Sequence, residues 1–248
     1  MTKKILCLLT VLSMLVSVFF LSSCGIISIG GDSEENWEYK SENMADSKEL
    51  INTFFEETFK QTNMTVTAKT NGEDFFKSEL EGSKYHIYYY GTKADIHLYV
   101  DGKDYVYALN ADGVKTYMTE KEMYDTIYNT YESYVKFLDN ISEEDAKDCT
   151  FNGHVVGHAV TKAEDGSTTS SATFEFVMSN QESKLTMSAE AENDLVKTMT
   201  ISMESEGETR TTVFVFTYGG ATVTIPDLKD YTKLEMSDIS DESQPSED

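Results

Sequence analysis

Short segments in which apolar and polar residues alternate recur along most of this chain, and glycine-containing turns separate them. The pairs Asn71-Gly72, Asp101-Gly102 and Asp112-Gly113 are typical of two-residue β-hairpin turns. We therefore predict strands near 63–70, 74–80, 84–90, 94–100, 104–109 and 114–118, and again near 149–161, 168–178, 184–190, 195–204, 209–218 and 221–225. Because strands joined by hairpins pair with their neighbours, we expect one antiparallel meander of about 11 strands.

The later strands have one polar and one apolar face. Threonine, serine and glutamate occupy every second position, and large apolar side chains occupy the positions between them. The apolar positions include Phe174, Phe176, Met187, Met199 and Ile201. A sheet of about 11 strands tends to curl, so we expect its apolar face to be concave.

Two segments replace the alternation with helical spacing. The first runs from about 46 to 61 and opens with Asp46 and Glu49, spaced as in a capping box. The second lies between Thr119 and Ile141, and its apolar stripe includes Tyr124, Ile127, Tyr128, Tyr131 and Tyr134. Helices this apolar are normally buried, so we expect both to lie across the apolar face of the sheet, which gives an α+β fold.

The N-terminus carries an export signal. Lys3 and Lys4 precede an apolar run from Ile5 to Leu21, which is too short and wrongly flanked for a lasting membrane helix. Ser22 and Ser23 then lead into Cys24, and this ending resembles the lipobox of bacterial lipoprotein signal peptides. The resemblance implies that residues 1–23 are removed and that Cys24 carries a diacylglycerol anchor on the extracytoplasmic face of the cell membrane. An ordinary secretory signal that happens to contain a cysteine is the alternative.

The remaining chain divides into a tether, one domain and a tail. Residues 24–43 are predicted to form a flexible tether, 44–234 a single domain, and 235–248 an acidic disordered tail. Cys7 leaves with the signal and Cys24 is the lipid site, so Cys149 has no partner for an intramolecular disulfide. We expect a monomer.

The chain is strongly acidic. Removing residues 1–23 takes away two of the 20 basic residues and no acid, which leaves 18 against 44 acidic residues and a net charge of −26. Such a charge opposes binding to nucleic acid, which rewards clustered lysine and arginine. We therefore expect no nucleic-acid partner.

The order of these elements resembles the outer-membrane lipoprotein-carrier superfamily, to which mycobacterial lipid-binding lipoproteins belong, and uncharacterised lipoproteins of Gram-positive bacteria. The segments that carry the likeness are LSSC at 21–24, YHIYYYGTKADIHLYVDGKDYVYALNADGVKTYM at 85–118 and VTIPDLKDY at 223–231. The resemblance implies an unclosed half-barrel whose concave face, lidded by helices, holds acyl chains.

Catalytic and metal-binding patterns are weak in this sequence. His154 and His158 lie on a predicted strand, where residues four apart are ~13 Å apart and do not readily share one metal ion. His86 and His97 fall on neighbouring strands, but we find no carboxylate or cysteine spacing that completes a site. Cys149 lacks a neighbouring base, and no hydrolase, zinc-protease or phosphate-loop motif is present. We expect no enzyme activity, no metal and no cofactor beyond the lipid on Cys24.

Two functional hypotheses remain. In the first, an apolar ligand, a lipid among the candidates, binds between the helices and the sheet, lined by Tyr124, Ile127, Tyr128, Tyr131, Tyr134, Phe174, Phe176, Met187, Met199 and Ile201. In the second, the same side chains form a fully packed core, and the protein is a scaffold or sensory lipoprotein that binds a protein partner. Aromatic and methionine side chains on an apolar sheet face suit either hypothesis.

Overall fold

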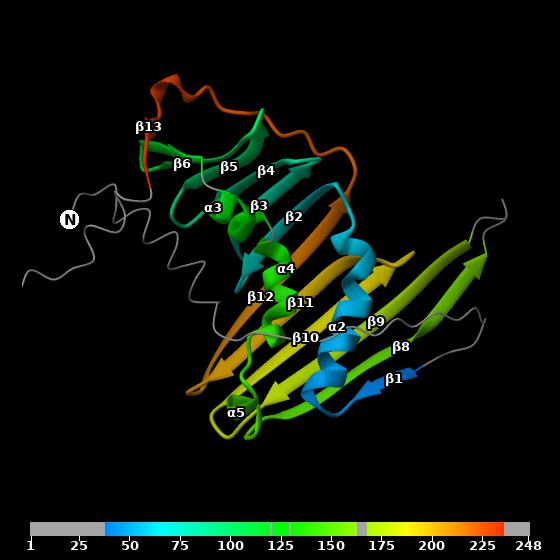
Figure 1. Ribbon diagram of the computed structural model, residues 1–248. Coiled ribbons are helices and arrows are strands. Elements are labelled where there is room, and N and C mark those ends of the chain that lie inside the picture. The colour runs from blue at the N-terminus through cyan, green and yellow to red at the C-terminus, as the bar shows by residue number, and fades with distance from the viewer. Residues whose placement is uncertain (1–37, 120, 129, 163–167, 236–248) are drawn as a thin grey trace, which may run out of the picture.

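The computed structural model describes residues 38–119, 121–128, 130–162 and 168–235 (Figure 1). The helices are α2 (Met44–Phe59), α3 (Lys121–Tyr128), α4 (Thr130–Val135) and α5 (Glu143–Ala146), with 3-10 turns η1 (Lys136–Asp139) and η2 (Leu228–Asp230). The predicted signal peptide, Cys24 and most of the tether and tail lie outside the described residues. Within the described residues, no helix is both long and apolar enough to cross a bilayer.

Most of the described chain forms one large, unclosed sheet of 13 strands. The strands are β1 (Glu38–Ser41), β2 (Asn63–Thr70), β3 (Glu73–Glu81), β4 (Lys84–Tyr89), β5 (Ala94–Asp101), β6 (Asp104–Ala111), β7 (Val114–Met118), β8 (Thr150–Lys162), β9 (Thr168–Ser179), β10 (Ser183–Glu192), β11 (Leu195–Ser205), β12 (Glu208–Tyr218) and β13 (Thr232–Lys233). Strands β2 to β12 correspond to the first 11 segments predicted from the alternation, so that part of the prediction is confirmed.

The strand order differs from a single meander. The order is β1-β8-β9-β10-β11-β12-β2-β3-β4-β5-β6-β7-β13, so two meanders are joined side by side through the antiparallel pair β12 and β2. Strand β7 therefore does not pair with β8, the next strand in sequence. Strand β13 pairs with β7 in parallel. The alternation predicts each hairpin but carries no information about which strands pair between the two meanders.

This topology explains where the helices lie. The chain must cross the sheet from β1 to β2 and again from β7 to β8, and the crossings contain α2 and the segment from α3 to α5, respectively. In Figure 1, α2, α3 and α4 lie over one face of the sheet. Helix α2 contacts β8 and β11, and α3 contacts β5 and β6. We call this helix-covered side the inner face and the opposite side the outer face.

Both helical predictions shift in detail. Helix α2 begins at Met44 rather than about 46, because the Asn43 side chain caps it by accepting a hydrogen bond from the Asp46 backbone N–H at 2.9 Å. The second helix is described as α3, α4 and the tighter 3-10 turn η1, which ends at Asp139.

Strand β1 lies inside the range expected for the tether. It pairs with β8 through the register Ser41↔Gly153, and Ser41 is buried with its Oγ 3.1 Å from Ser47 Oγ of α2. The sheet therefore begins at Glu38, before the predicted domain boundary at residue 44. A four-residue strand of mixed polar residues has no alternation that would distinguish it from a tether.

The predicted last strand, 221–225, is absent. The consecutive residues Gly219 and Gly220 both have φ of 75° and turn the chain away from the sheet after β12. Asn63 then holds Ala221 through two side-chain hydrogen bonds of 3.0 Å, and Glu81 accepts from Val223 N–H at 3.0 Å. Because β12 already pairs with β11 and β2, the next segment has no free neighbour beside it and continues to β13 at the edge.

Candidate functional sites

The predicted ligand-lining residues on the strands lie on the inner face. Phe174, Phe176 and Met187 are fully buried, Met199 is 1% exposed, and Ile201 is partly buried. On the helices, Tyr124 is buried, whereas Tyr128 and Tyr134 are partly buried. The side chains of Ile127 and Tyr131 lie outside the described residues.

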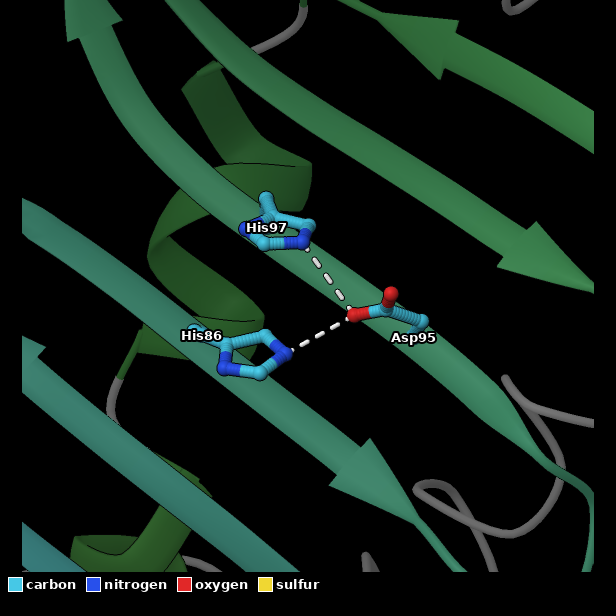
Figure 2. Close-up of side chains that lie close together, drawn as sticks. All are labelled: His86, Asp95 and His97. Carbon is cyan, nitrogen blue, oxygen red and sulfur yellow. Dashed lines mark hydrogen bonds and ion pairs between the residues drawn. The ribbon is translucent and has the colours of Figure 1, made fainter. Parts of the chain in front are cut away.

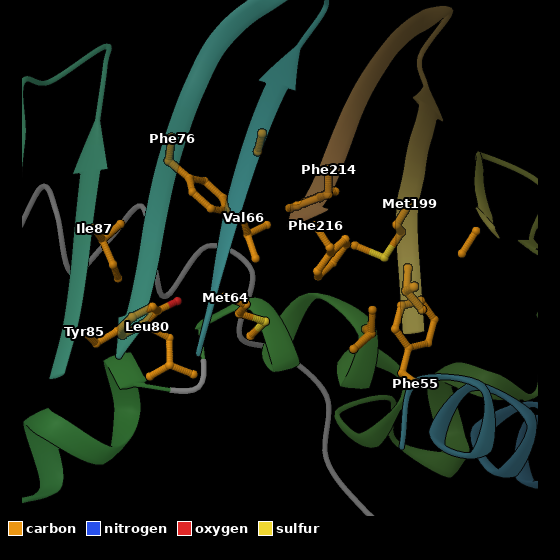
Figure 3. Packing of buried hydrophobic residues seen from close by; sticks show 14 of the residues in the cluster. Phe55, Met64, Val66, Phe76, Leu80, Tyr85, Ile87, Met199, Phe214 and Phe216 are labelled. Carbon is orange, nitrogen blue, oxygen red and sulfur yellow. The ribbon is translucent and has the colours of Figure 1, made fainter. Parts of the chain in front are cut away.

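Protein side chains surround the deepest of these residues. Phe54 of α2 lies 5.3 Å from Phe174 between ring centroids, and Phe137 of η1 lies 6.2 Å from Phe176. In Figure 3, the Phe55 ring of α2 lies near Met199, and Phe214 and Phe216 of β12 lie on the other side of Met199. At its centre, the inner face therefore consists of aromatic side chains that pack between helix and sheet.

Helix α3 is held to the β3–β4 turn by two tyrosines. The Tyr124 hydroxyl donates to Ser83 C=O at 2.9 Å, and the Tyr128 hydroxyl donates to Gly82 C=O at 3.0 Å. Their rings stack with centroids 5.3 Å apart. Burial raises the pKa of Tyr124 to about 12, so this hydroxyl keeps its proton and its hydrogen bond at neutral pH.

One row of apolar side chains on the inner face ends at an exposed methionine. Cross-strand pairs place Met178 beside Leu185 and Leu185 beside Met203, while Ile201 pairs with Met187. Met178, Leu185 and Ile201 are partly buried, and Met203 is 55% exposed. We call these four residues the open strip. It is an adaptable apolar surface joined to the packed core.

The outer face carries a histidine cluster that the sequence analysis missed. His86 of β4 and His97 of β5 lie on neighbouring strands, as predicted, and the sheet register places them directly opposite each other. Asp95 lies two residues before His97, so it projects from the same face. The neighbouring inner-face residues Tyr85, Ile87, Ile96 and Leu98 are buried, which fixes the three polar side chains on the other side.

One carboxylate oxygen joins the two imidazoles (Figure 2). Asp95 Oδ1 lies 2.8 Å from His86 Nε2 and 3.1 Å from His97 Nε2. The imidazole rings are stacked, with centroids 4.5 Å apart and planes 13° apart. On the far side of the ring, His86 Nδ1 lies 3.1 Å from Glu79 Oε2 of β3. His86 is therefore placed between two carboxylates.

These contacts set the charges of the cluster. Burial lowers the pKa of His86, but the hydrogen bonds to Asp95 and Glu79 outweigh it, so that pKa is raised. Hydrogen bonds from His86 and His97 hold the pKa of Asp95 well below its usual range. Burial raises the pKa of Glu79, whereas hydrogen bonds from Lys77 and His86 lower it further than burial raises it. Both carboxylates are therefore ionised at neutral pH.

The sequence analysis found no carboxylate spacing beside His86 and His97, whereas the structure places the Asp95 carboxylate between them. The signal was present as Asp95-x-His97, because residues two apart on a strand share a face. The sequence alone did not supply the exact register that also brings Glu79 opposite His86.

The other residues weighed for chemistry remain separate. His154 pairs with Glu175 across β8 and β9, with His154 Nε2 and Glu175 Oε2 3.1 Å apart, and the His158 side chain is not among those described. Burial raises the pKa of the Cys149 thiol, and Asp148 and Asp145 raise it further, so the reactive thiolate is disfavoured.

A search of protein-family models and of curated proteins finds no match to this chain.

Proposed function

We propose that this protein is a non-catalytic lipoprotein, anchored through Cys24 on the extracytoplasmic face of the membrane, that binds an apolar ligand between its helices and a concave sheet face. The ligand class is a lipid or another molecule with an acyl-like chain. The likeness of element order to the lipoprotein-carrier superfamily motivates the proposal.

The observation that carries the proposal is the open strip. Apolar side chains on a solvated sheet face are normally covered, yet Met203 is 55% exposed at the end of a row that leads under the helices. Methionine is unbranched and polarizable, and it adapts to ligands of irregular shape. An acyl chain that lies along Leu185 and Ile201 toward Met187 extends the existing core.

The cover beside the strip is made of short pieces. Segments α4 and η1 contain six and four residues, and they meet the sheet through side chains such as Phe137. Isolated helices this short are unstable without tertiary contacts. Displacing them to enlarge the strip breaks little regular structure, so the proposed ligand enters at this end.

Full enclosure of Phe174, Phe176 and Met187 favours the second candidate function. If these contacts never open, the protein is a scaffold or sensory lipoprotein with a packed core, and a protein partner binds its exposed surface. Both functions share the anchor and differ in whether the domain takes up an apolar molecule.

The test uses the unacylated chain from residue 25 onward, which includes β1. Native mass spectrometry and solvent extraction measure co-purifying lipid, and titration with a fluorescent fatty acid measures binding. We expect Met203→Glu to weaken binding about tenfold or more, since it places a charge on the apolar strip. The matched control is Val213→Glu, at an exposed apolar position of the outer face (37% exposed). Absence of both extracted lipid and fatty-acid binding refutes the carrier function.

A further inference from the structure

We infer that His86, Asp95 and His97 form a binding site for a divalent first-row transition-metal ion of the zinc class on the outer face of the sheet. The site is independent of the proposed apolar-ligand function, since the two occupy opposite faces. Each of the three residues offers one ligand atom, and these atoms all lie within 4.8 Å of one another.

The distances suit coordination after a small adjustment. Around a tetrahedral ion with bonds of ~2.0–2.2 Å, neighbouring ligand atoms are ~3.4 Å apart. Asp95 Oδ1 already lies 2.8 Å and 3.1 Å from the two Nε2 atoms, so an ion entering between them has to push these atoms apart by only a few tenths of an ångström. The stacked imidazoles must also tilt, so that both lone pairs point to one place. Rotation about the terminal torsion of histidine is soft, which makes this tilt inexpensive.

Glu79 orients the ring of His86 from behind the proposed metal site. A metal-ligating histidine typically donates its other ring N–H to a carboxylate, which orients the ring and makes it a better ligand. Glu79 Oε2 occupies this position at 3.1 Å from His86 Nδ1, and Lys77 Nζ in turn lies 2.7 Å from Glu79 Oε1. Nε2 of His86 donates its proton to Asp95 in the metal-free protein and must release that proton to solvent when it binds the ion, as must Nε2 of His97, while Nδ1–H of His86 stays on Glu79.

The donor set selects the class of ion. Two imidazoles and one carboxylate suit zinc and its first-row neighbours, whereas calcium and magnesium prefer sites built from oxygen. Three protein ligands leave a fourth position for water or for a group from another molecule. The side chains are 23% exposed for His86, 34% for Asp95 and 13% for His97, so an ion can reach them from solvent.

The comparison site for an experiment is His154 with Glu175. This pair lies on the same sheet at a similar separation of 3.1 Å, and it combines one histidine with one carboxylate. One imidazole and one carboxylate make a much weaker metal site than three convergent ligands. His154→Gln therefore controls for metal bound loosely by the many surface carboxylates.

The test is calorimetric titration of the metal-free chain from residue 25 onward with Zn²⁺ in excess Ca²⁺, which occupies adventitious carboxylate sites. We expect one zinc ion per chain. We expect its affinity to fall at least about tenfold in His86→Gln, Asp95→Asn and His97→Gln, and about 10–100-fold in Glu79→Gln. His154→Gln should bind zinc like the parent protein.

Two spectroscopic readouts report the ligands directly. The imidazole ¹⁵N signals of His86 and His97 should shift together on addition of zinc while those of His154 stay in place, and Co²⁺ should give the visible absorption of a low-coordinate nitrogen-containing site. Failure of the parent protein to bind one zinc ion, or equal loss in His154→Gln, overturns the inference. Since no apolar ligand takes part, these outcomes leave the carrier function untouched.

Discussion

Gly153 is the position where a single added methyl group most directly tests the packing of β1 and α2 on β8. A Cβ atom at Gly153 would lie 2.5 Å from Ser41 Oγ, 3.0 Å from Leu50 Cδ2 and 3.3 Å from Phe176 Cδ2. All three neighbours are buried, and Ser41 is also hydrogen-bonded to Ser47. We therefore expect Gly153→Ala to overpack this site.

The expected cost follows from two opposing effects. Overpacking a core by one methyl group costs ~1–3 kcal/mol, and replacing glycine with alanine returns ~0.4–1 kcal/mol by restricting the unfolded chain. The free energy of unfolding should therefore fall by about 1–2 kcal/mol, which corresponds to a Tm lower by roughly 2–8 °C for a domain of this size. Urea denaturation followed by circular dichroism measures the change.

Two further variants make this prediction specific. Gly91→Ala is the matched control, because its Cβ would meet no atom within 4 Å and its φ is not positive, so it should raise stability by the ~0.4–1 kcal/mol that comes from restricting the unfolded chain. Ser41→Ala removes the nearest atom, so adding Gly153→Ala in that background should cost less than in the parent. Equal stability of Gly153→Ala and the parent, or an unchanged cost in the Ser41→Ala background, refutes the packing described for β1 and α2.

Three other variants test the aromatic core, a buried tyrosine and the predicted lipid anchor. Phe174→Ala should lower the free energy of unfolding by ~3–5 kcal/mol in urea denaturation, because the ring is fully buried against Phe54 and Phe55. Burial raises the pKa of Tyr218 to about 12, and the Tyr218 hydroxyl donates a hydrogen bond to Val196 C=O. The stability that the protonated hydroxyl contributes is complete below pH ~10, the pKa of tyrosine in the unfolded chain, and is lost as the pH rises toward 12. The difference in free energy of unfolding between the parent and Tyr218→Phe should therefore narrow across that pH range, as measured by urea denaturation at each pH. Cys24→Ser should abolish acylation, and an unchanged precursor mass and membrane retention would refute the anchor.

Local patterns predicted the strands because hairpin physics is local. Turns such as Asp112-Gly113 need a positive φ, and the structure gives these two residues φ values of 50° and 77°. Alternation also predicted the buried positions, since Phe174, Phe176 and Met187 face the core. Both signals lie within a few residues of sequence, which is why they could be read without the fold.

Long-range pairing could not be predicted in the same way. The register Phe216↔Val66 joins β12 to β2 across 150 residues of sequence, and any two strands with the same alternation would match as well. The histidine cluster depends on such a register too, because Glu79 reaches His86 only through the β3–β4 pairing. The alternation predicts which face of the sheet a residue occupies. The register between strands determines which residues are its neighbours on that face.

The two faces of the sheet carry different side chains because of how the chain crosses the sheet. Since the crossings from β1 to β2 and from β7 to β8 both place helices on the inner face, apolar packing is concentrated there and the outer face stays accessible to polar side chains. On β4 and β5 the outer face brings two imidazoles together beside ionised carboxylates, in a chain with a net charge of −24. An acidic surface attracts cations in general, but only convergent nitrogen donors distinguish zinc-class ions from calcium. The same topology that leaves the inner face for apolar contacts thus leaves a place for selective metal binding on the outer one.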